Sequence, residues 1–236
     1  LVGRDPDRSW TLDPVWDCHD WGAPFPINVT PGPSLIAFIK ACAERDINVL
    51  LSTWFRKERA RADRWIPTPE VHAELWAETI AHIGKAGLLD TIIGVDLCNE
   101  WPIKLFAPFY PGEGHLMEDS SLDWMRRAVA ALKERYPQMP ATFSWCGARR
   151  GPRGPEAKQA FAFLDFLEPH IWMAQADAAR FYRTLGYEYI HFGNKGYNEI
   201  LPRAEALYRD NPDYWFGLLD EHIQWIAGQS KEAGKR

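Results

Sequence analysis

Short apolar runs alternate with longer stretches of helical periodicity along most of the chain. Four runs have the length and the β-branched or aromatic content of buried strands, and they cover residues 47–53, 91–97, 141–145 and 166–173. Apolar residues at helical spacing predict helices over residues 34–45, 68–87, 120–136, 156–164, 175–185, 198–209 and 213–233. Residues 1–33 carry six prolines and no sustained period, which predicts a long irregular loop.

The alternation of strands and helices indicates parallel strands joined by helical crossovers, and hence an α/β fold. A doubly wound sheet would be expected to carry a glycine-rich phosphate loop after a strand, and the sequence contains neither GxGxxG nor a P-loop. We therefore predict a (β/α)8 TIM barrel, with residues 1–236 as a single catalytic domain. A complete barrel typically takes about 250 residues or more. Because the four strands found here are widely spaced, we expect an incomplete barrel that lacks N-terminal strands and strands 7 and 8.

Charge and hydropathy narrow the range of partners. The 236 residues carry a formal net charge of −5 and no basic patch, so we expect no nucleic-acid partner. No apolar run reaches the roughly 18 residues that a membrane helix needs, so we expect no association with a membrane. The CxxC spacing of zinc sites is absent among the cysteines, Cys18, Cys42, Cys98 and Cys146. Buried thiols are favoured over a disulfide.

Tryptophan is the unusual feature of the composition, with 12 residues among 236. Several lie beside Asp, Pro, Gly or His in loop-like segments, namely Trp10, Trp16, Trp21, Trp101 and Trp145. A large core accounts for part of this content. Tryptophan outside regular core segments also suits a ligand surface with flat apolar faces, and the apolar C–H faces of sugar rings stack well on such a surface.

Polar and aromatic residues collect directly after the predicted strands, at Trp54, Arg56, Asn99, Glu100, Trp145, His170 and Trp172. The carboxyl ends of the strands form the active face of a TIM barrel, so we predict that these residues and Trp101 line a site. Structural alternatives exist for each type: a strand-end Glu can cap a helix or pair with Arg, a lone His is often a core residue, and Trp or Arg can belong to the rim. Asp96, inside its strand, is expected to have a structural hydrogen-bonding role.

The segment Gly94–Pro102, which ends a strand with Asn99-Glu100, resembles the strand-four signature of the clan A retaining glycoside hydrolases, the clan of cellulases and mannanases. Two strands later, His170-Ile171-Trp172 stands where that clan has His-x-Tyr. The resemblance covers roughly strands three to six, and the segment looks most like cellulase-like proteins described as sugar-binding. It implies that Glu100 is the general acid/base and that Asn99 contacts the 2-hydroxyl of the substrate.

Retaining hydrolysis uses two carboxyl groups about 5–5.5 Å apart, one as acid/base and the other as nucleophile. The clan places the nucleophile, a second Glu, at the end of strand seven. After the fourth strand the chain offers Glu188, Glu199, Glu205, Glu221 and Glu232. Only Glu188 lies in a strand-like run, and that run follows His170 too soon to be strand seven. We therefore expect the nucleophile beyond Arg236, and we expect residues 1–236 alone to be inactive.

The leading hypothesis is a glycosidase that hydrolyses a β-linked oligo- or polysaccharide and uses no metal and no organic cofactor. The first alternative is a TIM barrel that binds carbohydrate without catalysis. The second alternative is a barrel enzyme of another chemistry, such as a metal-dependent hydrolase. That enzyme would need clustered ligands at several strand ends, where the sequence supplies only Glu100 and His170.

Overall fold

The structure, a computed structural model, describes residues 5–12, 14, 25–55, 66–146, 159–171, 183–185 and 194–235, with the backbone alone for residues 194–201. Its labelled strands are β1 (Trp10–Leu12), β2 (Ile27–Val29), β3 (Val49–Ser52), β4 (Ile92–Asp96), β5 (Ala141–Thr142), β6 (Trp145–Cys146) and β7 (Pro169–His170). Its labelled helices are α1 (Pro31–Ala43), α2 (Pro69–Lys85), the short 3-10 turn η2 (Leu89–Thr91), α3 (Asp119–Arg135), α7 (Asn194–Asp210) and α8 (Pro212–Ala233).

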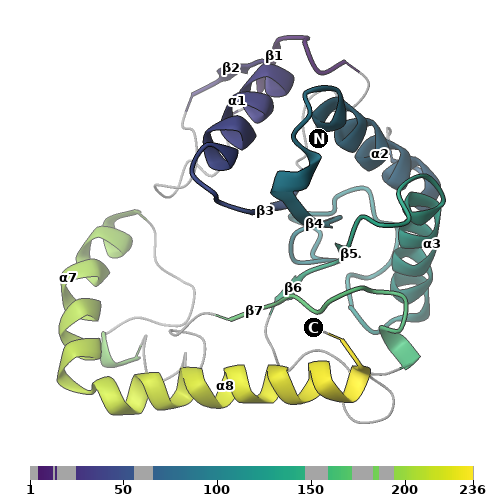
Figure 1. Cartoon of the computed structure of the whole chain (residues 1–236). Helices are drawn as coiled ribbons and strands as arrows, with labels where there is room; N and C mark the ends of the chain where they lie inside the picture. Colours follow the sequence, from purple (N-terminus) through teal and green to yellow (C-terminus); the bar gives the residue numbers. More distant parts are fainter. Residues whose placement is uncertain are drawn as a thin grey trace.

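The central strands pair in parallel and in chain order. β3 pairs with β4, with Leu51 opposite Val95, and β4 pairs with β5, with Val95 opposite Ala141. The run from Ala141 to Cys146 changes partner along its length, because its far end, β6, pairs with β7. Helices α2 and α3 follow β3 and β4 as crossovers, pack against each other, and lie along one side of these strands (Figure 1). The predicted α/β fold with parallel strands is confirmed.

Two features differ from the sequence prediction. The described strands form a three-stranded parallel sheet and two two-stranded sheets rather than a closed barrel, so the barrel stays a prediction. The loop predicted over residues 1–33 is wrong in part, because β1 and β2 form an antiparallel pair and α1 already begins at Pro31. Proline fits the first turn of a helix, where its missing N–H would have no intrahelical acceptor, so Pro31 starts the helix instead of preventing it.

The other predicted helices correspond closely to α2, α3, α7 and α8. Helix α2 begins at Pro69 because Thr68 caps it: the Thr68 Oγ1 accepts a hydrogen bond from the Val71 amide at 3.3 Å. Helix α8 ends at Ala233 because Gly234 takes up a left-handed conformation with φ 66°. Much of the predicted helices 156–164 and 175–185 lies outside the described residues.

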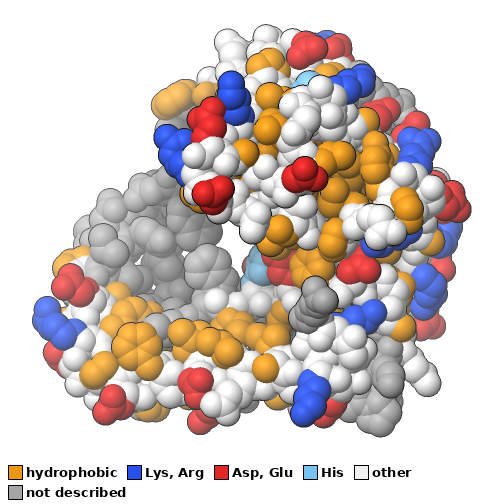
Figure 2. All heavy atoms as spheres, in the orientation of Figure 1, with side chains coloured by type: hydrophobic (Ala, Val, Ile, Leu, Met, Phe, Trp, Pro, Cys, Tyr) orange, Lys and Arg blue, Asp and Glu red, His pale blue; other side chains and the backbone are white. Residues whose placement is uncertain are grey.

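Helices α7 and α8 carry a small core of their own, centred on Leu185, Ala204 and Trp215. Apolar side chains gather along α8 on the face seen in Figure 2, and Phe216 and Ile223 of this helix are exposed. No helix in the described part of the chain is long and apolar enough to cross a membrane. Among the described cysteines, Cys42, Cys98 and Cys146 are in no disulfide, and Cys18 lies outside the described residues.

The main core contains an aromatic cluster that joins α2, α3 and the segments after β4 and β5. Its members are all buried: His72, Trp101, Phe109, Tyr110, Trp124 and Phe143. His72 accepts a hydrogen bond at Nδ1 from the Trp124 indole (3.3 Å), so its proton is on Nε2, which donates to the Leu97 carbonyl (2.9 Å). The Trp76 indole donates to the same carbonyl at 2.9 Å. Helix α2 thereby anchors the end of β4.

The buried imidazole of His72 predicts a loss of stability in acid. Burial lowers the pKa of His72 to about 4, whereas an unfolded histidine has a pKa of about 6.5. Between these values the unfolded chain binds a proton that the folded protein does not, so this contribution to the free energy of unfolding falls as the pH falls. We expect the loss to reach about 3 kcal/mol at pH 4.

The pH dependence of the parent protein alone does not isolate His72, because burial raises the pKa of the Glu168 carboxyl to about 7. That shift increases the free energy of unfolding as the pH falls, so it opposes the effect of His72. The measurement is therefore a comparison of two proteins. Urea unfolding of the parent and of His72→Gln should be followed between pH 7 and pH 4. The difference in unfolding free energy between them should shrink by about 3 kcal/mol as the pH falls. The control is His115→Gln, which removes an exposed imidazole. A His72→Gln difference that stays constant with pH would contradict the prediction.

Candidate functional site

Glu100 lies in a short segment that leaves β4 and is held by the strands on both sides. The amide of Asn99 donates to the Thr53 carbonyl at 2.7 Å, just beyond β3. The amide of Trp101 donates to the Ser144 carbonyl at 2.8 Å, between β5 and β6. These bonds continue the parallel pairing past the end of β4, so the main chain of Glu100 is fixed relative to both neighbouring strands.

The main chain of Glu100 is in the left-handed region, with φ 49°. This conformation is uncommon for residues other than glycine. Its amide donates to the Ser144 Oγ at 2.9 Å. Unfavourable main-chain conformations persist where the surroundings determine them, and they cluster at functional sites. The observation therefore supports a functional reading of Glu100.

The side chain of Glu100 meets His170 of β7, which is 70 residues further along the chain. The Oε1 of Glu100 and the Nδ1 of His170 are 3.0 Å apart, and the two side chains are 13% and 25% exposed. The hydrogen bond with Glu100 raises the pKa of His170, the charges of Glu100, Glu168 and Asp96 act in the same direction, and burial opposes them. The hydrogen-bonded pair thus lies at a place that solvent still reaches.

Beneath this pair, Asp96 at the end of β4 is fully buried. Its Oδ1 accepts from the amides of Ser144 (2.8 Å) and Cys98 (3.3 Å), and its Oδ2 accepts from the hydroxyls of Ser52 (2.6 Å) and Ser144 (2.8 Å). Burial raises the pKa of the Asp96 carboxyl, and the hydrogen bonds from Ser52 and Ser144 oppose this rise. These contacts agree with the structural role expected for Asp96.

Glu168 is a member of this group that the sequence reasoning missed. Burial, and after it the charge of Asp96, raise its pKa to about 7. Its Oε2 is buried and has no hydrogen-bond partner among the described residues. Alternate residues of a strand face the same side, so its position two residues before His170 was a signal that could have found it.

The predicted aromatic residues of the site separate into two groups. Trp101 and Trp145 are 1% and 3% exposed, and Trp145 packs on Phe161 with ring centroids 5.1 Å apart. Neither ring is accessible to a ligand in this structure, because both lie inside the packed core. Trp54, just after β3, is 47% exposed. Arg56 and Trp172 lie outside the described residues.

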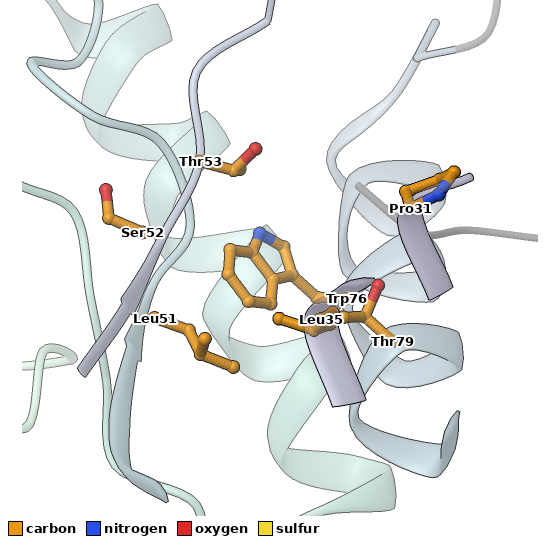
Figure 3. Close-up of a pocket in the computed structure, with 7 residues that line it drawn as sticks. All are labelled: Pro31, Leu35, Leu51, Ser52, Thr53, Trp76 and Thr79. Carbon is orange, nitrogen blue, oxygen red and sulfur yellow. The ribbon is translucent and has the colours of Figure 1, made fainter. Parts of the chain in front are cut away.

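A pocket of about 290 Å³ lies elsewhere, between the end of β3 and the helices α1 and α2. Figure 3 shows the residues that line it: Pro31, Leu35, Leu51, Ser52, Thr53, Trp76 and Thr79. Neither Glu100 nor His170 is among them. Within the described residues, no three His, Cys, Asp or Glu side chains come together as a group that could hold a metal ion.

Comparisons with known proteins agree with the cellulase-like part of the resemblance seen in the sequence. A family model described as "Cellulase-like: Sugar-binding cellulase-like" matches residues 1–236. A crystal structure of a "putative glycoside hydrolase" from Parabacteroides distasonis ATCC 8503 matches with a TM-score of 0.82 and 35% sequence identity. The match covers 100% of this chain and 62% of that one, and no curated protein matches. Because the family model spans the whole sequence, the chain belongs to the sugar-binding cellulase-like family.

Proposed function

We propose that the chain carries the acid/base half of a retaining β-glycosidase, with Glu100 as the general acid/base. The observation that carries this proposal is the 3.0 Å contact between Glu100, in the segment that leaves β4, and His170 of β7. Membership of a cellulase-like family and the likeness to the Parabacteroides protein support it. We propose a β-linked oligo- or polysaccharide as the substrate and a (β/α)8 barrel, of which the described parallel strands form a part, as the architecture.

In this mechanism the carboxyl of Glu100 first gives a proton to the glycosidic oxygen, and later takes a proton from the water that releases the sugar. The described contacts of this carboxyl are to Oε1, through His170 Nδ1. This hydrogen bond fixes the orientation of the carboxyl and leaves Oε2 for the leaving group. Asn99, partly exposed beside it, is placed to contact a sugar hydroxyl, and the exposed ring of Trp54 can stack on a sugar face.

The second carboxylate of a retaining site acts as a nucleophile and must be ionised and open to the substrate. Neither neighbour of the pair suits this role. Both oxygens of Asp96 accept hydrogen bonds inside the protein, and the pKa of Glu168 is raised to about 7. We therefore propose that the nucleophile is a residue outside the described part of the chain, as are the proposed substrate contacts Arg56 and Trp172.

The stereochemistry of the first product tests the proposal. The protein expressed from its complete reading frame should be incubated with β-linked gluco- and manno-oligosaccharides, and ¹H NMR should follow the anomeric protons. We expect the β-anomer to form first, because two successive displacements retain the configuration. Formation of the α-anomer first would show an inverting enzyme and would contradict the proposed retaining mechanism.

The second candidate is a catalytically silent sugar-binding protein, and the description of the family as sugar-binding favours it. Such a protein would keep Trp54 and Asn99 as ligand contacts and would release no product. Isothermal titration with the same oligosaccharides separates the two. Binding by the parent protein, together with no new reducing ends after prolonged incubation at high enzyme concentration, would replace the hydrolase proposal with this one.

A further inference from the structure

Ser144 makes contacts that link Glu100 to the buried carboxylate below it. Its Oγ accepts the hydrogen bond from the Glu100 amide (2.9 Å) and lies 2.8 Å from the Oδ2 of Asp96. Its carbonyl accepts from the amide of Trp101, and its own amide donates to the Oδ1 of Asp96, both at 2.8 Å. Ser144 is fully buried, so water does not compete for these bonds.

The donor and the acceptor of each hydrogen bond between Glu100, Ser144 and Asp96 follow from the chemistry of the groups. The amide of Glu100 can only donate, so the Ser144 hydroxyl accepts there and gives its own proton to Asp96. The amides of Ser144 and Cys98 likewise only donate, so Oδ1 of Asp96 is an acceptor twice over. A carboxylate that receives this set of donors is held in one orientation, and it bridges β3, β4 and the run from β5 to β6.

We propose that Asp96 is a positioning residue of the Glu100 site and that it acts through Ser144. The inference rests on the proposed function and deepens it. Asp96 holds the Ser144 hydroxyl in the orientation that accepts the Glu100 amide, and this bond holds Glu100 in its left-handed conformation. The carboxyl of Glu100 then lies against His170. The left-handed conformation is unfavourable for a residue with a β-carbon. Contacts with surrounding residues must therefore stabilise it at Glu100.

Asp96 has a second, electrostatic effect that makes the inference measurable without catalysis. Its charge raises the pKa of His170, as do the charges of Glu100 and Glu168, the other acidic groups that act on this ring. Removal of the charge in Asp96→Asn should therefore lower the pKa of His170. Removal of the hydroxyl in Ser144→Ala should free the main chain of Glu100 without changing any charge.

The run from β5 to β6 that contains Ser144 also offers a matched control. Thr142 is fully buried, lies two residues before Ser144 and opposite Asp96 in the strand pairing, and its hydroxyl donates to the Phe166 carbonyl at 2.8 Å. Thr142→Val removes one buried hydroxyl with little change in volume. A merely structural role for Ser144 would give the two variants similar phenotypes.

Kinetics of the protein from its complete reading frame give the first readout. We expect Ser144→Ala to lower kcat about 10–100-fold, because a misplacement of about 1 Å can cost on the order of 100-fold, while KM stays within about threefold. We expect Thr142→Val to keep kcat within about twofold. Equal losses of kcat in the two variants would overturn the inference.

Two readouts do not depend on turnover. A crystal structure of Ser144→Ala should show Glu100 leaving the left-handed region or losing its contact with His170, and NMR titration of Asp96→Asn should show a lower pKa of His170 than in Thr142→Val. An unchanged Glu100 and an unchanged His170 would overturn the inference. If Asp96→Asn does not fold, the Ser144→Ala structure decides alone. An inactive parent protein would overturn the proposed function, and these two readouts would still test the positioning role.

Discussion

Glu100→Gln is expected to lower kcat for β-glycosides with poor leaving groups by about 10²–10⁴-fold, the usual contribution of a general acid. Glutamine keeps the size of the side chain and can hold a hydrogen bond to His170, but it has no proton to give to the glycosidic oxygen. The measurement is initial-rate kinetics on the protein from its complete reading frame, with alkyl β-glycosides or β-linked disaccharides as substrates.

Leaving-group chemistry makes this test specific to the acid role. The leaving group of an activated aryl glycoside, such as a dinitrophenyl β-glycoside, departs without protonation. The rate at which its glycosidic bond is cleaved should therefore fall far less in Glu100→Gln than the rate for a disaccharide. The control is Glu113→Gln, which removes an exposed carboxylate from the loop after β4. Equal losses of kcat/KM, which reports the first bond cleavage, on both kinds of substrate would argue that Glu100 is not the acid. An unaffected variant would exclude Glu100 from the chemistry.

Trp101→Ala is expected to lower the free energy of unfolding by about 3–5 kcal/mol, the range for removing a large aromatic side chain from a core. Trp101 is 1% exposed. Its indole lies 4.7 Å from the ring of Tyr110 and 5.2 Å from that of Phe143, and its Nε1 donates to the Ser121 hydroxyl at 2.9 Å. Truncation would leave a cavity and a hydroxyl without its donor. Urea unfolding gives the measurement, and Trp101→Phe, which keeps most of the ring, should lose less.

Trp54→Ala provides the contrasting variant. Its ring is 47% exposed and touches Phe106 with centroids 5.3 Å apart, so we expect a loss of stability of about 1 kcal/mol or less. If Trp54 stacks on a sugar, the same variant should bind oligosaccharides more weakly. A Trp101→Ala protein as stable as the parent, or one that lost only sugar affinity, would show that Trp101 is a ligand contact after all.

Local sequence patterns predicted most of the strands and helices, and they predicted the place of Glu100 in the candidate site. The four predicted strand runs correspond to the strands β3 to β7, and the helices α2, α3, α7 and α8 correspond to predicted helices. Short apolar runs are typical of buried strands, and apolar residues at a period of 3.6 bury one face of a helix. The place of Glu100 at the end of a strand also follows from the sequence alone, since a strand that ends in polar residues can be recognised without knowing its neighbours.

Tertiary structure decided which of these residues meet and which are accessible. Trp54 and Trp101 each come soon after a strand in the sequence, yet Trp54 is 47% exposed and Trp101 is 1% exposed. Trp101 is buried because His72 of α2 and Trp124 of α3 pack around its ring. Glu168 takes its raised pKa from burial and from Asp96, a residue of another strand.

The sequence by itself determined the order of parallel strands and helices, the family, and Glu100 as the candidate acid/base. Only the tertiary structure placed His170 against Glu100 across 70 residues and joined Asp96 to Glu100 through Ser144. The physical reason is the range of the interactions: periodicity and capping act between residues a few positions apart, whereas these hydrogen bonds cross between strands. Their geometry is set by the register and twist with which the strands pair.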